Sequence, residues 1–144
     1  MSHKPHITHV DFTSICVDEL KHIEIEFEHK ISRTGVMHGF GLYFDAYFRG
    51  SERKNQVILS TAPENPATHW YQTRLLMREP LGVTKNQKLK GTLKLEANTE
   101  QSFDGTLIVD VPALEIRLEN HYDMKDLNYR GTHQSYVDYY ASVN

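Results

Sequence analysis

The feature that most constrains the fold is an alternation of apolar and polar residues with a period of two. It is clearest over residues 23–28, 88–97 and 114–119, where most of the residues that separate the apolar side chains are Glu, Lys or Arg. Successive side chains of a β-strand point to opposite faces, so this pattern predicts strands with one buried face and one face in water. Helical spacing of apolar residues is nearly absent, and only residues 18–21 favour a single helical turn.

Less regular segments complete a set of at least seven short strands. Residues 40–48 carry aromatic side chains on both faces, which predicts one strand that is covered on both sides or lies under a partner surface. Further strands are expected at residues 57–59, 73–77 and 107–111, separated by Gly, Asn and Pro turns. Many short strands favour an all-β fold, an antiparallel β-barrel or sandwich with little helix.

Composition limits the domain organisation and the kinds of partner. A chain of 144 residues suits one domain, and we expect a lead-in at 1–9, a β-domain at 10–131 and an extended tail at 132–144. The net charge of −3 argues against non-specific nucleic-acid binding but is compatible with a basic peptide. No apolar run approaches the roughly 20 residues of a membrane span, so no membrane partner is expected. The single cysteine, Cys16, cannot form an internal disulfide, and we expect an intracellular protein.

An acidic stretch leaves two interpretations open. The stretch contains five acidic residues, Asp18, Glu19, Glu24, Glu26 and Glu28, of which the last three alternate with apolar residues. The alternation favours the solvated face of a strand, while a surface that meets a basic peptide is the alternative.

One loop, residues 60–72, differs from the other connections. The chain has no glycine-rich nucleotide loop, no cysteine pair and no HExxH, so no metal site is predicted. In this loop two prolines restrict the backbone before His69, Trp70 and Tyr71. A histidine exchanges protons near neutral pH, and a tryptophan face suits a guanidinium cation. The alternative is that Trp70 packs inward as a plug and His69 only bonds to backbone.

The sequence of this loop resembles that of a known family. Residues 66–72, Pro-Ala-Thr-His-Trp-Tyr-Gln, are similar to the threonine-histidine-tryptophan loop of protein arginine methyltransferases. Further similar segments are residues 23–25, 37–45, 59–63, 79–81, 91–92, 98–103, 123–125 and 129–130. The resemblance covers about residues 10–130 and is strongest to the coactivator-associated branch of the type I enzymes.

The resemblance implies the C-terminal β-barrel of such an enzyme, its substrate-side half. In the family, an N-terminal domain binds S-adenosylmethionine and carries two catalytic glutamates, and a helical arm forms the homodimer. Neither the cofactor motif, the double-glutamate loop nor the arm is recognisable in this sequence. We therefore expect the chain alone to be inactive. The full enzyme is expected to be a homodimer that methylates arginine in histones or other basic proteins, in the nucleus and cytoplasm.

The resemblance also implies roles for particular residues. His69 would position the substrate arginine and brace the acidic groups of the other domain. Trp70 would line the arginine slot, with Thr68 and Tyr71 beside the substrate, and Tyr129 would touch the substrate backbone. One departure is Tyr43, which stands where the closest branch has Trp.

A second hypothesis belongs to a different functional class. The chain would be a free-standing β-sandwich binding module, with Trp70 and Tyr71 as an aromatic platform for a sugar or a cationic peptide. That hypothesis predicts ligand binding by the isolated chain.

Overall fold

A computed structural model of the chain describes residues 4–49 and 56–125. The elements, in chain order, are α1 (Val17–Lys21), β1 (His22–Lys30), β2 (Gly35–Leu42), β3 (Asp45–Arg49), β4 (Gln56–Ser60), β5 (Thr73–Val83), β6 (Lys88–Ala97), β7 (Phe103–Val111), the 3₁₀ turn η1 (Pro112–Leu114) and β8 (Ile116–Asp123). The described residues form two compact units, one up to His38 and again from Met77, the other Gly39–Leu76. The predicted all-β class, antiparallel strands with one short helix, is confirmed.

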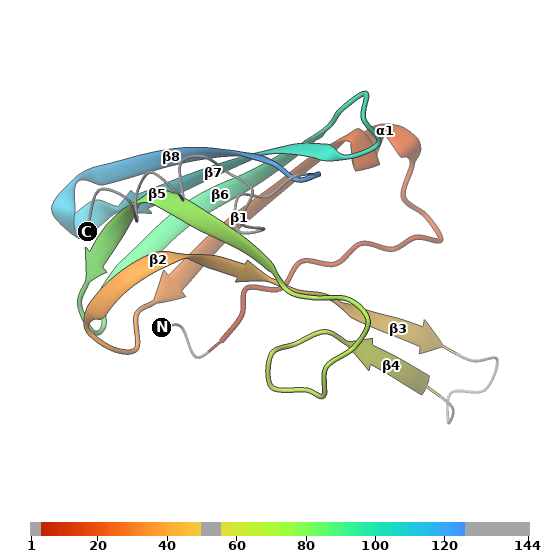
Figure 1. Ribbon diagram of the computed structural model, residues 1–144, viewed down its shortest axis with the longest axis horizontal. Coiled ribbons are helices and arrows are strands. Elements are labelled where there is room, and N and C mark those ends of the chain that lie inside the picture. The colour runs from red at the N-terminus through yellow and green to blue at the C-terminus, as the bar shows by residue number, and fades with distance from the viewer. Residues whose placement is uncertain (1–3, 50–55, 126–144) are drawn as a thin grey trace, which may run out of the picture. The chain divides into compact units, whose positions relative to one another are not determined.

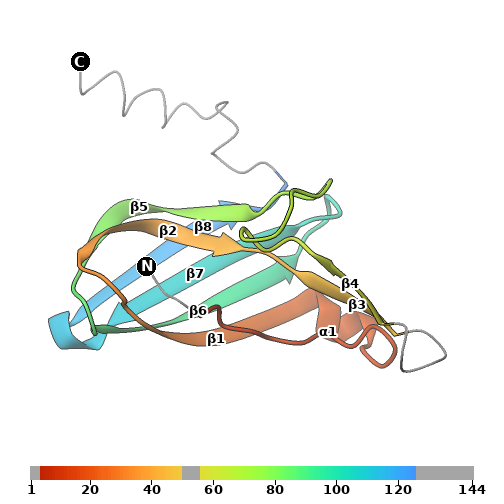
Figure 2. The same cartoon turned by 90° about the horizontal axis from the view of Figure 1, so that it is seen from below.

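The first unit is built on a four-stranded antiparallel sheet in the order β1, β6, β7, β8 (Figures 1 and 2). Strand β6 has the bounds that its alternation predicted, and its Leu93 lies opposite Ile25 of β1 and Leu107 of β7. The buried positions of β6 and β7 alternate with exposed or half-buried ones. The side chains buried from these two strands are Leu89, Leu93, Leu107, Val109 and Val111. Each stabilises the unit by roughly 1.5–3 kcal/mol through burial.

The opposite face of this sheet carries charge. Glu24 and Glu28 lie opposite Lys94 and Lys90 in the register of β1 with β6. Their carboxylates form ion pairs with these lysines at 3.5 and 3.6 Å, and Glu28 also pairs with Lys88 at 3.0 Å. The hydrogen bond from Lys88 and its charge lower the pKa of Glu28. Glu24, Glu26 and Glu28 therefore lie on the solvated face of a strand, as the alternation favoured, whereas Asp18 and Glu19 lie in α1 and the strand prediction was wrong for them.

Two strand predictions were wrong in detail. Residues 40–48 are not one strand, because β2 ends at Leu42 and β3 begins at Asp45. Between them the backbone N–H and C=O of Phe44 bond to Thr61. The strand expected from residue 114 begins at Ile116, since residues 112–114 form η1 with a proline in its first turn.

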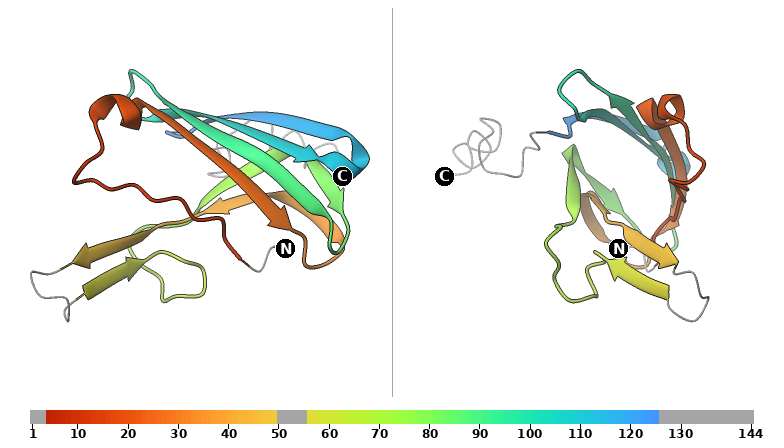
Figure 3. Two further views of the ribbon diagram at one scale, coloured as in Figure 1. Left: turned by 180° about the vertical axis from the view of Figure 1, so that it is seen from behind. Right: turned by 90° about the vertical axis from the view of Figure 1, so that its right-hand side faces the viewer.

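The second unit contains residues 39–42, the ribbon of β3 and β4, the loop 61–72 and the first residues of β5. Strands β3 and β4 pair antiparallel and form a two-stranded ribbon (Figure 3). In its register Asp45 lies opposite Ser60 and Phe48 opposite Val57. A Cβ atom at Gly39 of β2 would lie 2.1 Å from the carbonyl oxygen of Leu75 in β5. Glycine is therefore required at this close approach of the two paired strands.

The structure does not test the predicted domain boundaries or the predicted tail. The tail at 132–144 lies outside the described residues, and the boundaries at 9 and 131 remain expectations. Among the residues that the structure describes, no helix has the length and apolar character needed to cross a membrane.

Candidate functional site

The loop that joins β4 to β5, residues 61–72, is anchored at one buried hydroxyl. Thr61 is 2% exposed, and its Oγ1 accepts a hydrogen bond from the Phe44 backbone N–H (2.9 Å) and donates to the Phe44 carbonyl oxygen (3.0 Å). At the other end of the loop, Gln72 Nε2 donates to the Thr61 carbonyl oxygen at 2.8 Å. Thr61, at the start of the loop, is thus bonded to Gln72, at its end, and this bond holds the two ends of the loop together.

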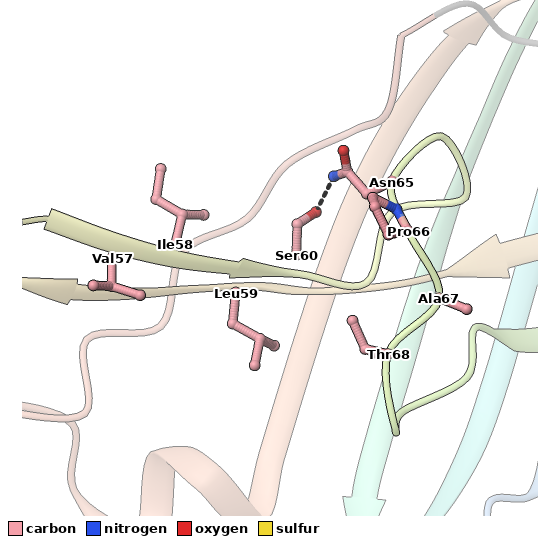
Figure 4. A pocket seen from close by; sticks show the side chains of 8 residues that line it. All are labelled: Val57, Ile58, Leu59, Ser60, Asn65, Pro66, Ala67 and Thr68. Carbon is pink, nitrogen blue, oxygen red and sulfur yellow. Dashed lines mark hydrogen bonds between the residues drawn. The ribbon is translucent and has the colours of Figure 1, made fainter.

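The first half of the loop is tied to the β3–β4 ribbon through polar side chains. Ser60 Oγ donates to Asp45 Oδ1 at 2.5 Å. It also accepts from Asn65 Nδ2 at 2.7 Å, the bond that Figure 4 draws as a dashed line. The backbone N–H of Asn65 also donates to the Ala62 carbonyl oxygen, which closes a turn. The prolines that the sequence analysis noted, Pro63 and Pro66, lie in and just after this turn.

The second half of the loop carries the predicted site residues. Thr68 Oγ1 donates to the Trp70 carbonyl oxygen at 2.9 Å and accepts from the Trp70 backbone N–H at 3.2 Å. These bonds bridge the backbone around His69, whose imidazole meets the Trp70 indole edge-on at 5.8 Å. The half-buried Thr68 therefore shapes the turn that carries an exposed His69.

Trp70 is held from one side and open on the other. Its indole packs edge-on against Phe44, with ring centroids 6.1 Å apart, yet 51% of the residue remains exposed. The alternative interpretation of Trp70 as an inward plug was therefore wrong. Tyr71 is more open still, at 87% exposed, and Tyr129 lies outside the described residues.

Sequence reasoning gave no role in the site to Phe44, Thr61 or Gln72. Phe44 was predicted only as part of one strand over residues 40–48, and Thr61 was noted only inside a segment similar to the family. Phe44 and Thr61 are 17 residues apart in the chain, and their contact cannot be predicted from the alternation of apolar and polar residues. The same holds for the bond between Gln72 and Thr61. These three residues hold the loop, whereas Thr68, His69 and Trp70 present its chemistry.

A surface pocket of about 630 Å³ lies between strand β4 and the loop (Figure 4). It is lined by Val57, Ile58, Leu59, Ser60, Asn65, Pro66, Ala67 and Thr68. None of these eight residues is charged, so the pocket offers no counter-ion to a guanidinium group. Acidic groups of the same unit, Glu64 and Asp45, contribute after burial to the raised pKa of Tyr43.

The described residues provide no evident site for a metal. Within 4–49 and 56–125 no group of three or more His, Cys, Asp or Glu side chains is arranged to hold an ion.

Comparison with known proteins identifies similar sequences and folds. The family model described as the arginine methyltransferase oligomerization subdomain matches residues 1–110. The histone-arginine methyltransferases CARMER of Drosophila persimilis and Drosophila virilis are each 39% identical over 127 residues, or 88% of this chain. The chain spans about a quarter of the length of these relatives (24% and 23%).

A solved structure is similar as well. It is the Trypanosoma brucei PRMT1 enzyme-prozyme heterotetrameric complex with AdoHcy. The TM-score is 0.68 at 28% sequence identity, over 78% of this chain and 36% of that one.

Proposed function

Because the chain belongs to the arginine methyltransferase family, whose oligomerization subdomain model it matches, we propose that it is the substrate-side half of a protein arginine N-methyltransferase. The observation that carries the proposal is the loop of residues 61–72. It is fixed at both ends by a buried threonine and presents His69 and Trp70 to solvent. A substrate-positioning loop needs this combination of a rigid base and an accessible tip.

The proposed reaction is methylation of the guanidinium of arginine in histones or other basic proteins. S-adenosylmethionine, bound by a separate N-terminal domain, supplies the methyl group. The solved T. brucei relative is a complex with AdoHcy, which is what S-adenosylmethionine becomes when it loses its methyl group. The pocket beside the loop has no charged lining residue. The acidic groups that bind a guanidinium would therefore come from the separate N-terminal domain, which supports the proposal that two domains share the reaction.

Each site residue receives a role in positioning. The imidazole of His69 can donate a hydrogen bond to a carboxylate of the other domain, and it would thereby orient the acidic groups around the arginine. The exposed side of Trp70 can stack on the guanidinium, and Phe44 behind it keeps the indole in place. Thr68 holds the turn, while Tyr71 and Tyr129 are proposed to contact the peptide.

The rest of the proposal concerns the whole protein. We propose a homodimer in the nucleus and cytoplasm, in which residues 10–131 form the substrate-side domain and the chain alone is inactive. The free-standing binding module is not favoured, because the family match extends over residues 1–110 rather than over the aromatic loop alone.

The test is kinetic and uses the full-length enzyme. We expect His69→Ala to lower kcat/KM by about 100-fold or more, in the range found when a preorganised catalytic hydrogen bond is lost. His121→Ala is the matched control, because His121 is an exposed histidine of β8 that bonds the surface groups Thr106 and Glu119. Activity of His69→Ala within about twofold of wild type would remove His69 from the site.

A further inference from the structure

One end of the first unit carries a group of exposed cations. The connection from β1 to β2 (residues 31–34) and the turn from β5 to β6 (residues 84–87) lie side by side there, at the end of the sheet away from α1 (Figure 2). The exposed cations in these two connections and at the adjoining strand ends are Lys30, Arg33, Lys85, Lys88 and Lys90, called here the basic end.

Hydrogen bonds between the two connections hold their backbones together. The N–H of Ile31 donates to the Gln87 carbonyl oxygen at 2.9 Å, and the N–H of Asn86 donates to the Ile31 carbonyl oxygen at 2.8 Å. The N–H of Lys85 donates to Thr34 Oγ1 at 3.0 Å. Ile31 itself is 2% exposed, so these bonds are anchored in the core. The cations therefore stand on a backbone that is already ordered, which reduces the entropy cost of binding a ligand.

Ion pairs within the chain neutralise little of this charge. The carboxylate of Glu28 is shared by Lys88 at 3.0 Å and Lys90 at 3.6 Å. The remaining three cations form no ion pair with any residue in 4–49 or 56–125; these are Lys30, Arg33 and Lys85. The basic end therefore keeps an excess of positive charge that no carboxylate of the described chain offsets.

The register of the sheet adds to this excess. Farther along β1 and β6, Glu24 lies opposite Lys94 and forms an ion pair with it at 3.5 Å. At the basic end Lys30 lies opposite Lys88, the one pair of like charges in the register of these two strands. Like charges directly opposite each other on a sheet repel, so a bound anion would relieve an unfavourable interaction here.

We propose that the basic end binds a short acidic segment of a partner protein, one with several Asp or Glu side chains in succession. The guanidinium of Arg33 can donate two parallel hydrogen bonds to one carboxylate, while the lysine ammonium groups attract its neighbours. Thr34 adds a neutral donor, because its Oγ1 accepts from Lys85 and its hydroxyl hydrogen can point to the ligand. The basic proteins proposed as substrates would be repelled at this end, so the inference is independent of the proposed function.

The surroundings favour a short acidic peptide over nucleic acid or a membrane. On the outer face of the sheet, Glu26 of β1 and Asp110 of β7 border the basic end, and Asp110 lies opposite Lys90. A nucleic-acid strand or an anionic lipid surface would extend over these carboxylates. The net charge of −3 also opposes non-specific binding to such polyanions.

The test measures binding of a fluorescein-labelled peptide of consecutive glutamates to the 144-residue chain, by fluorescence anisotropy at low ionic strength. The variant Arg33→Gln/Lys85→Gln removes two cations that have no ion pair among the described residues. Lys21→Gln/Lys94→Gln is the matched control, because it removes the same charge from cations that already form ion pairs. We expect the first variant to weaken binding by about tenfold or more and the control by less than about twofold, with added salt weakening the wild type.

Three results would overturn the inference. The wild-type chain could show no binding of the glutamate peptide at low salt. The two variants could weaken binding equally, which would assign it to the overall charge of the chain. An oligonucleotide of equal charge, or a vesicle of phosphatidylserine and phosphatidylcholine, could bind more tightly than the peptide and lose that binding in Arg33→Gln/Lys85→Gln. In that case the ligand of the basic end would be nucleic acid or a membrane instead of a peptide.

Discussion

The ring of Phe44 meets the indole of Trp70 edge-on, with centroids 6.1 Å apart and ring planes inclined by 72°. The backbone of Phe44 is in turn bonded to the Thr61 side chain, which also begins the loop that carries Trp70. Phe44 lies in the break between β2 and β3. Its ring therefore supports the indole of Trp70, which we propose to line the arginine slot.

Removing that ring should loosen the indole. Trp70 is the only tryptophan of the sequence, so fluorescence excited at a wavelength that tyrosine does not absorb reports on this site alone. We expect Phe44→Leu to shift the emission to longer wavelength and to increase acrylamide quenching, because an aromatic pair contributes about 0.5–1.5 kcal/mol beyond its buried area. Phe12→Leu, at a residue 80% exposed, should leave the spectrum unchanged. An unaltered spectrum in Phe44→Leu would show that the contact does not hold Trp70.

The Thr61 hydroxyl should contribute measurably to the stability of the fold. In Thr61→Val the backbone N–H of Phe44 loses its part-buried acceptor at 2.9 Å, so we expect the free energy of unfolding to fall by about 1–3 kcal/mol. Urea unfolding measures the loss. Thr106→Val is the matched control on β7, where the hydroxyl bonds an exposed histidine, and it should cost less than about 0.5 kcal/mol. Equal losses in the two variants would contradict the anchoring role.

The sequence predicted regular strands well and their interruptions poorly. Alternation fixed β6 at residues 88–97, because burial on one face and water on the other is a local property of each residue pair. The break at residues 43–44 depends on Thr61, 17 positions away, and aromatic residues on both faces concealed it. Likewise the motif at residues 66–72 identified the loop, but only the structure shows that Phe44 and Gln72 support it.

A glycine in the sheet provides a test of close strand packing. A Cβ atom at Gly91 of β6 would lie 2.3 Å from the carbonyl oxygen of Ile108 and 2.4 Å from Phe27 Cζ. The backbone oxygen cannot yield cheaply, so Gly91→Ala should lower the free energy of unfolding by about 1–3 kcal/mol. Gly82→Ala is the control, because nothing lies within 4 Å of its added methyl group. If both variants unfold at the same urea concentration, the packing around Gly91 is looser than the structure shows.

Stability at alkaline pH should depend on Tyr122. Burial raises the pKa of its phenol from 10.0 to about 12. The unfolded chain loses this proton at lower pH than the folded one, so the contribution is complete below pH 10 and is lost as pH rises toward 12. Tyr122→Phe should flatten this part of the urea-midpoint profile, whereas Tyr71→Phe, at an exposed ring, should not. Parallel profiles for wild type and Tyr122→Phe would remove Tyr122 as the cause.

Calorimetric titration of S-adenosylmethionine into the 144-residue chain tests the proposed division of labour. We expect no binding heat, because the pocket beside the loop has only uncharged lining residues and the sequence carries no glycine-rich cofactor loop. The full-length protein serves as the positive control and should bind the cofactor under the same conditions. Stoichiometric binding by the isolated chain would mean that the cofactor site lies within these residues, and His69 and Trp70 would then have to be reconsidered as cofactor contacts rather than substrate contacts.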